Sequence, residues 1–261
     1  SKLVVSDPSR TVREIMTTDF DPISAETPET EVASKFERYD LISAPVIDKD
    51  GSLIGRITID DVVDVIMEQA DKSLLGLAGL AEDEDTFAPI FKTVRSRAIW
   101  LGANLGTAFL ASAVINIFED TIEKVVALAI LMPIVASMGG VAGSQTLTLA
   151  IRSEALGQLV DSNQIWLIKR ELAVGAINGF VWAAIVAAAA TIVFDDMLLG
   201  GIIASALIIN LLIAALAGAV LPGVLKSIGA DPAISGSVVL TTITDVVGFM
   251  SFLGLASFFY A

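Results

Sequence analysis

Five long apolar stretches in the last two thirds of the chain limit the folds that this sequence can adopt. A helix needs about 20 mostly apolar residues to cross a ~30 Å hydrocarbon core. The chain of 261 residues is 54% hydrophobic, with a mean hydropathy of +0.76, which is unusual for a soluble protein of this size. We therefore predict an α-helical membrane protein with five transmembrane helices, at residues 98–118, 124–150, 165–193, 198–225 and 233–260.

The charged residues predict how these spans are oriented. Residues 1–85 hold 20 of the 30 acidic and 8 of the 16 basic residues, and they lack the apolar core of a signal peptide, so we expect them to stay in the cytoplasm. We then expect a multi-pass protein of the cell (inner) membrane, with its N-terminus in the cytoplasm and its C-terminus outside. On this topology the positive-inside rule is satisfied by the basic residues that flank the spans: Arg95, Arg97, Arg152, Lys169, Arg170 and Lys226.

The sequence lacks two residue types, which limits the kinds of metal site and catalytic site that it can form. The chain contains no Cys and no His, so a metal site must use oxygen ligands, which favour hard ions such as Mg²⁺, Ca²⁺ or Mn²⁺. A net charge of −14 argues against binding to nucleic acid. The spans offer no paired acid and base for catalysis, so we predict that the protein is not an enzyme.

One carboxylate, Asp245, lies in the fifth span, ~18 Å from its start and thus near the membrane midplane. A charge at this depth costs about 2.5–3.5 kcal/mol, so a functional role is the first interpretation. Thr241, Thr244 and Gly248 share with it one helical arc of about 120°, and such a small, polar stripe suits a water-filled path. The alternative is a carboxylate that neighbouring hydroxyls satisfy inside a helix bundle.

The second span combines Pro133 with Gly139, Gly140 and Gly143. Such residues disturb a membrane helix and are tolerated where the backbone lines a cavity or packs against protein. The carbonyl groups of Gly139 and Gly140 suit a hard cation or its hydration water. The alternative is a close helix crossing, and we expect the other small residues of the spans, such as Ala187–Ala190, to serve packing.

Four segments of the chain carry a resemblance to a known family. They read FEDTIEKVVALA, PIVASMGGVAGSQTLTLAIR, KRELAVGAINGF and LAGAVLPGVLKSIGADPAISGSVVLTTITDVVGF. They resemble, in order, the membrane domain of MgtE-type magnesium channels and transporters. The resemblance implies a homodimer whose pore is lined by the second and fifth spans, with Asp245 holding a hydrated Mg²⁺. Where the family usually has Asn after Gly-Gly, this chain has Val141, which leaves its preference among Mg²⁺, Mn²⁺ and Co²⁺ open.

The polar first part resembles one cystathionine-β-synthase (CBS) motif. Residues 11–70 read strand, helix, strand, strand, helix, with short β-branched strands at SAPVID and LIGRIT and a turn at 48–51 between them. The motif is similar to the second of the two in MgtE-type proteins, and residues 1–10 resemble the end of the first. We expect a fragment of a longer protein, with a CBS motif at 1–71, an acidic linker and connecting (plug) helix at 72–97, and a transmembrane domain at 98–261.

Acidic residues recur along the last helix of this motif, and like charges at i,i+4 repel each other unless a cation relieves them. A solvated acidic face is the ordinary explanation. The resemblance implies instead a Mg²⁺ sensor, which continues through residues 82–85 toward the plug helix. The sensor residues would be Asp60, Asp61, Asp64, Glu68 and Asp71.

The segment GRITIDD also matches a pattern with which CBS domains hold a nucleotide such as ATP, here through Thr58 and Asp61. The alternative is that Thr58 caps the helix that begins near Asp60.

These features together predict a Mg²⁺-selective channel or transporter that imports divalent cations and is gated by cytoplasmic Mg²⁺. Its expected partners are a second copy of the chain, the lipid bilayer and the cation. The alternatives are a secondary transporter or exporter of Mg²⁺, Mn²⁺ or Co²⁺, a membrane enzyme, and a CBS protein that chiefly senses nucleotides.

Overall fold

The structure, a computed structural model, describes residues 7–16, 21–78, 80, 87–155, 159 and 161–260. The chain forms two compact units, Ser1–Ala70 and Asp71–Ala261. Residues 82–85, the acidic run before the predicted plug helix, lie outside the described residues.

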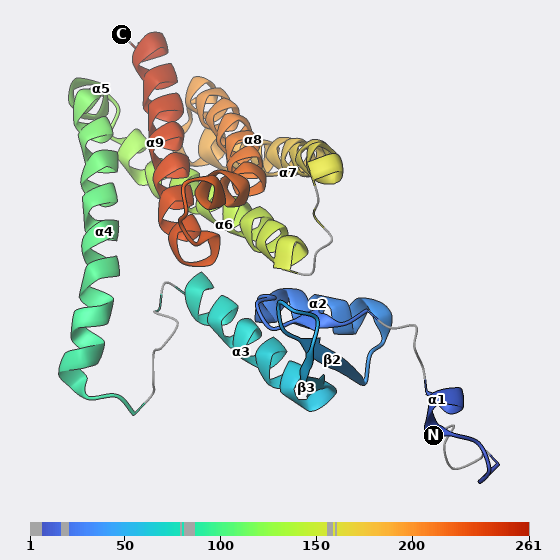
Figure 1. Cartoon of the computed structure of the whole chain (residues 1–261). Coiled ribbons are helices and arrows are strands. Elements are labelled where there is room, and N and C mark those ends of the chain that lie inside the picture. The colour runs from blue at the N-terminus through green and yellow to red at the C-terminus, as the bar shows by residue number, and fades with distance from the viewer. Residues whose placement is uncertain are drawn as a thin grey trace. The chain divides into compact units, whose positions relative to one another are not determined.

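The first unit is a small α/β fold (Figure 1). Its elements are α1 (Val12–Ile15), β1 (Ile23–Ser24), α2 (Glu29–Tyr39), β2 (Ser43–Ile47), β3 (Leu53–Thr58) and the first part of α3 (Ile59–Leu77). Strand β1 pairs with β2 in parallel and β2 pairs with β3 antiparallel. The core joins the sheet to both longer helices through Ile23, Val32, Ala33, Phe36, Ala44 and Val62. The predicted strand–helix–strand–strand–helix order is therefore confirmed, with α1 preceding it.

The turn between β2 and β3 is also confirmed. The Asp48 carboxylate accepts hydrogen bonds from the backbone N–H groups of Asp50 and Ser52, at 3.0 and 2.8 Å. Gly51 has a φ of 79°, a left-handed conformation that glycine adopts without steric cost. Local turn chemistry thus closes the hairpin, while Ala44 of β2 and Ile57 of β3 anchor it to the core.

The second unit is helical, and the predicted five spans are confirmed. Its further elements are α4 (Ile90–Ile117), α5 (Glu119–Lys124), α6 (Ala127–Ala155), α7 (Asp161–Phe194), α8 (Met197–Ser227) and α9 (Pro232–Tyr260). All of these except the short α5 are long and apolar enough to cross a membrane. Helix α4 runs without interruption past residue 97, where we expected a plug helix to end and the first span to begin.

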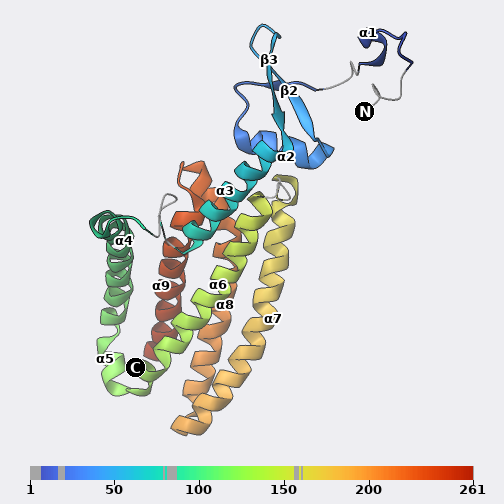
Figure 2. The same cartoon turned by 90° about the horizontal axis from the view of Figure 1, so that it is seen from below.

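Helix α8 forms the centre of this unit and packs against α6, α7 and α9, whereas α4 lies at the margin and packs chiefly along α9 (Figures 1 and 2). Small residues allow the close contacts. A Cβ at Gly218 of α8 would lie 2.8 Å from the carbonyl oxygen of Gly143 on α6, and one at Gly175 of α7 would lie 2.9 Å from the Ala215 Cβ. These contacts agree with the expected packing role of small residues.

Helices α7 and α8 are joined by a tight turn at Asp195 and Asp196. Asp195 has a φ of 50°, which Asp tolerates better than most residues. The Asp196 carboxylate caps α8 by accepting hydrogen bonds from the N–H groups of Leu198 and Leu199, at 2.8 and 3.0 Å, and it also accepts one from the Tyr260 hydroxyl. The bond from Tyr260 and those from the backbone lower the pKa of Asp196 below its usual value.

Candidate metal-ion site

The carboxylate of Asp245 lies in the middle of α9, 13 residues after the helix begins at Pro232, and its side chain is half-buried. Three hydroxyls on the same helix are tied to its own backbone. Thr241 donates to the carbonyl of Ser237 at 2.9 Å, Thr244 to that of Thr241 at 3.0 Å, and Ser251 to that of Gly248 at 3.1 Å. Because these hydroxyls donate to the helix, the oxygen lone pairs of the half-buried Thr241 and Ser251 remain available to accept hydrogen bonds from water, whereas Thr244 is fully buried.

An open groove of about 570 Å³ runs between α6 and α9. It is lined by Gly140, Val141, Ser144, Gln145, Thr148 and Thr241. Five of the six lining residues are a glycine, three residues with hydroxyls and one amide, and the sixth is Val141, 56% exposed, but most of the lining surface is carbon. Asp245 follows Thr241 by four residues, so both belong to the same face of α9. The groove offers oxygen ligands for a hydrated cation, the kind of ligand that Mg²⁺ accepts.

The structure separates the pore residues predicted from the sequence into two groups. Gly140 and Thr241 line the groove, and their role in a pore stays a prediction. Gly139, Thr244 and Gly248 are buried, and both glycines face a side chain of α8. The contact of Gly139 with α8 therefore agrees with the alternative interpretation, a close helix crossing. A role of these three residues in holding the ion stays a prediction.

The side chain that both glycines face is Asn210 of α8, which the sequence analysis did not single out. It is fully buried, and its Nδ2 donates to the carbonyl oxygen of Val135 on α6 at 2.9 Å. A lone Asn in an otherwise apolar span is a signal that was present in the sequence, since polar residues inside membrane helices bond to neighbouring helices.

A second group that we did not single out is the carboxylate of Glu171, on α7. It is 5% exposed, accepts a hydrogen bond from Thr146 of α6 at 3.0 Å, and pairs with Arg170 at 2.8 Å. Nearby at the same end of the bundle, Lys226 of α8 pairs with Glu154 of α6 at 2.6 Å. The hydrogen bond from Thr146 joins α6 to α7 and indicates a structural role for Glu171. Among the described residues this carboxylate has an ionic partner, whereas Asp245 has none.

The predicted sensor residues all lie on α3 with exposed side chains. Among the residues that the structure describes, no three carboxylates converge closely enough to hold a metal ion by themselves. The five carboxylates of α3 therefore form a row and not a preformed chelate, and their role in sensing stays a prediction.

The predicted nucleotide residues contact each other. The Asp61 carboxylate accepts hydrogen bonds from both the backbone N–H and the hydroxyl of Thr58, at 3.0 and 2.9 Å. This reverses the expected cap, because the acidic side chain at the third helical position reaches back to the residue before the helix, as in one half of a capping box. The pair thus has a structural use, and nucleotide binding stays untested.

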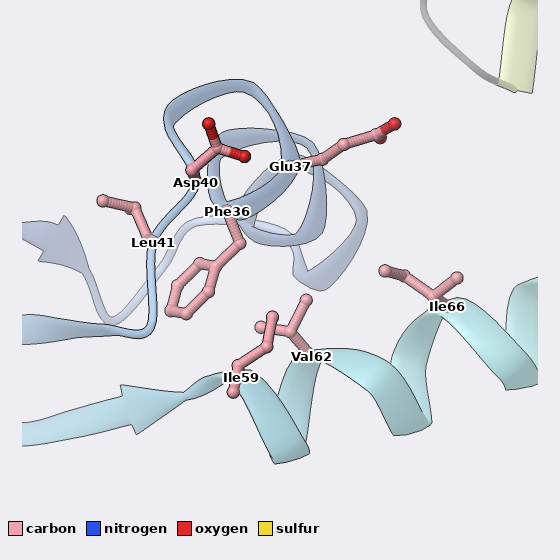
Figure 3. Close-up of a pocket in the computed structure, with 7 residues that line it drawn as sticks. All are labelled: Phe36, Glu37, Asp40, Leu41, Ile59, Val62 and Ile66. Atoms are coloured by element: carbon pink, nitrogen blue, oxygen red, sulfur yellow. The ribbon is translucent and has the colours of Figure 1, made fainter.

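A separate pocket of about 390 Å³ lies in the first unit, between α2 and α3 (Figure 3). Phe36, Leu41, Ile59, Val62 and Ile66 give it apolar walls, and Glu37 and Asp40 contribute its only charges. Neither Thr58 nor Asp61 lines it. Because two carboxylates would repel phosphate groups, this pocket does not suit a nucleotide.

Comparison with known proteins agrees with this geometry. Residues 132–255 match the MgtE family, described as a divalent cation transporter, and residues 12–68 match the CBS domain. The chain is 30% identical over 257 residues to a magnesium transporter MgtE of Bacillus subtilis. It is 28% identical to one of Enterococcus faecalis and 30% identical to one of Thermus thermophilus.

These alignments cover 97–98% of the chain but only 56–57% of each relative, so the chain spans little more than half of their length. The matched regions coincide with the two units of the structure, since the CBS match lies in the first and the MgtE match covers α8, most of α6 and α9, and all of α7. The chain therefore carries an MgtE-family domain in its helical unit, preceded by a CBS domain.

Proposed function

We propose that this chain transports Mg²⁺ across a membrane as a homodimer, and that Asp245 holds the ion in hydrated form. The observation that carries the proposal is a half-buried carboxylate in the middle of α9, on the helix face that borders a groove lined in part by hydroxyls and an amide. The names of the relatives, all magnesium transporters, support Mg²⁺ as the cargo. Mg²⁺ gives up its water reluctantly, so a wide groove of hydroxyls and an amide suits it better than a tight cage.

The open groove supports the homodimer. Several of its lining side chains, including Val141, Ser144 and Gln145, are exposed in the single chain. A water-filled path needs walls on all sides within the hydrocarbon core, because lipid cannot satisfy polar groups. A second copy that places its own groove opposite the first would enclose the path and bring two Asp245 carboxylates to the same ion.

The absence of cysteine in the sequence allows a direct test of this arrangement. A single cysteine in place of Val141 or Gln145 should cross-link two copies in the membrane, because both residues line the groove. The matched control is a cysteine in place of Ile192, which is 81% exposed on α7 and away from the groove. Efficient cross-linking at residue 192, with none at 141 and 145, would mean that the groove does not face a second copy.

Transport itself is tested with the chain in liposomes. We expect Mg²⁺ to enter along its own gradient without a gradient of Na⁺ or H⁺, because Asp245 has no second unpaired carboxylate beside it among the described spans that could bind a coupling ion. Dependence on Na⁺ or H⁺ would instead indicate a coupled transporter. Competition by Mn²⁺ and Co²⁺ measures selectivity, and no Mg²⁺ flux at all would contradict the proposal.

We propose further that the carboxylates of α3 sense cytoplasmic Mg²⁺ and reduce transport when it is abundant. Their exposed side chains and their spacing of three and four residues along the helix support this role, because the row of negative charge attracts divalent cations. Since no three of the described carboxylates converge, a bound ion would also draw ligands from water or from a second copy. On this proposal the N-terminal unit lies in the cytoplasm and the C-terminus outside.

A further inference from the structure

A buried amide lies behind both helices that border the groove. Asn210 of α8 donates from Nδ2 to the carbonyl oxygen of Val135 on α6, and the same nitrogen fills the space where side chains would lie at two glycines. A Cβ at Gly248 of α9 would be 2.8 Å from Nδ2. A Cβ at Gly139 of α6 would overlap Nδ2 and lie 2.8 Å from Cγ. One amide thus touches α6 and α9 at the same level.

Helix α6 is continuous at this level but contains residue types that weaken a helix. Pro133, two residues before Val135, lacks the N–H that would bond to the preceding turn. Gly139 and Gly140, one turn later, are poor helix formers. The N–H that the proline lacks would have bonded to the carbonyl of Ala129, so the bond from Asn210 to the Val135 carbonyl is an additional link between α6 and α8.

The other polar atom of the amide, Oδ1, indicates that Asn210 is not there to stabilise the fold. Asn210 Oδ1 is buried and has no hydrogen-bond partner in the part of the chain that the structure describes. A buried acceptor without a partner destabilises the folded state. An apolar residue of the same shape would avoid this cost, so a use of the amide in transport explains its presence better than stability does.

We infer that Asn210 is a positioning residue for the ion path: its amide fixes α6 against α9 at the depth of Asp245. This inference rests on the proposed function. Gly140 lines the groove and follows Gly139 directly, and Asp245 precedes Gly248 by three residues, less than one turn. A shift of either glycine away from the amide therefore moves a wall of the groove or the carboxylate itself, without any contact between Asn210 and the ion.

The test is Asn210→Leu, which keeps the branching at Cγ but removes both the N–H donor and the unpaired acceptor. We expect Mg²⁺ flux in liposomes to fall by about tenfold, the effect of one lost hydrogen bond of about 1.4 kcal/mol. The melting temperature should stay at or above that of the wild type, because an unsatisfied polar atom has been removed. Wild-type flux in this variant would overturn the inference.

A pair of variants keeps the test informative if Asn210→Leu does not fold. In Gly139→Ala the new Cβ collides with the amide, so flux and melting temperature should both fall. Adding Asn210→Ala makes room for that Cβ. We expect the double variant to recover the melting temperature but not the flux. Recovery of both would mean that the amide only fills space, and the inference would be wrong.

The matched control is Asn178→Leu. Asn178 is exposed on α7 and its Nδ2 donates to the carbonyl of Val174 in its own helix, at 3.1 Å. We expect wild-type flux in this variant, since it makes the same chemical change away from the groove. The Asp245→Asn variant, measured in parallel, separates the two ideas. Flux that needs Asp245 but tolerates Asn210→Leu refutes only the positioning role, whereas flux that ignores Asp245 refutes the proposed function.

Discussion

Two regions of this chain carry the carboxylates that matter for a cation, and they are built in opposite ways. Helix α9 has a single carboxylate, Asp245, half-buried among apolar and small side chains. Helix α3 has five, all exposed and spaced along one helix. Water screens the exposed carboxylates of α3 far more than it screens Asp245, so a cation interacts less strongly with each charge on α3.

The two regions should differ in how strongly a single substitution affects transport. In α9 one half-buried charge is screened less by water than an exposed charge, so its removal has a large effect that no other carboxylate of α9 compensates. In α3 an exposed charge contributes about 0–1 kcal/mol, so an effect appears only when several act together. We therefore expect single substitutions to reveal Asp245 and only multiple substitutions to reveal the sensor.

The largest effect is expected from Asp245→Asn, which keeps the shape of the side chain and removes its charge. Loss of a close charge pairing costs about 2–5 kcal/mol, and each 1.4 kcal/mol is about tenfold in affinity. Flux at low Mg²⁺ should therefore fall by about 30-fold or more, as measured in liposomes with dimerisation confirmed. Asp245→Glu should also transport poorly because it moves the charge. Normal flux in the Asn variant would mean that the carboxylate is structural.

An intermediate effect is expected from the triple variant of Asp61, Asp64 and Glu68 to Ala. Three exposed charges at about 0.5 kcal/mol each shift the Mg²⁺ concentration that closes the transporter by about tenfold. Flux at high internal Mg²⁺ should rise accordingly. The matched control is Asp64→Asn alone, for which we expect about a twofold shift. An equally large shift in the single variant would break the comparison between the two regions, and no shift in the triple variant would refute the sensor in this chain.

The smallest effect is expected from Val141→Asn, which adds an amide to the lining of the groove. One new hydrogen bond to hydration water is worth about 0.5–1.5 kcal/mol, so we expect flux, or the preference for Mg²⁺ over Mn²⁺ and Co²⁺, to change by about threefold. Dependence on Asp245 should persist. If Val141→Asn restored transport to Asp245→Asn, the ion would be held by the groove wall and not by the carboxylate.

The sequence predicted the number of spans well, because length and hydropathy are enough to identify a membrane helix. It did not predict which spans lie inside the bundle. Helix α7 is more apolar than α6 and α9, yet only 17% of its apolar segment is buried, against 33% in each of those two helices. Hydropathy gives no guide here, since lipid tails are as apolar as leucine.

The candidate site, too, could be predicted from the sequence only in part, because the packing of the helices decides which residues meet. A carboxylate in an apolar span is evident from the sequence, and so is a glycine pair. Which side of a helix faces the groove depends on its neighbours, so Gly139 and Gly140, adjacent in the sequence, lie on different sides. The link from Asn210 to Val135 joins residues 75 positions apart, and no local pattern gives such a pairing.

The uninterrupted course of α4 has a consequence for the lipid around it. Its 28 residues span about 42 Å at the usual rise, but Lys92, Arg95 and Arg97 lie in its first eight residues, so its apolar part is about 30 Å long and matches the hydrocarbon core of a typical bilayer. Because α4 packs chiefly along α9, few protein contacts fix its tilt, and the thickness of the bilayer sets much of it. A bilayer thinner than this apolar part would tilt α4 further against α9, the helix that bears Asp245. We therefore expect the thickness of the host membrane to act, through one marginal helix, on the helix that carries the carboxylate.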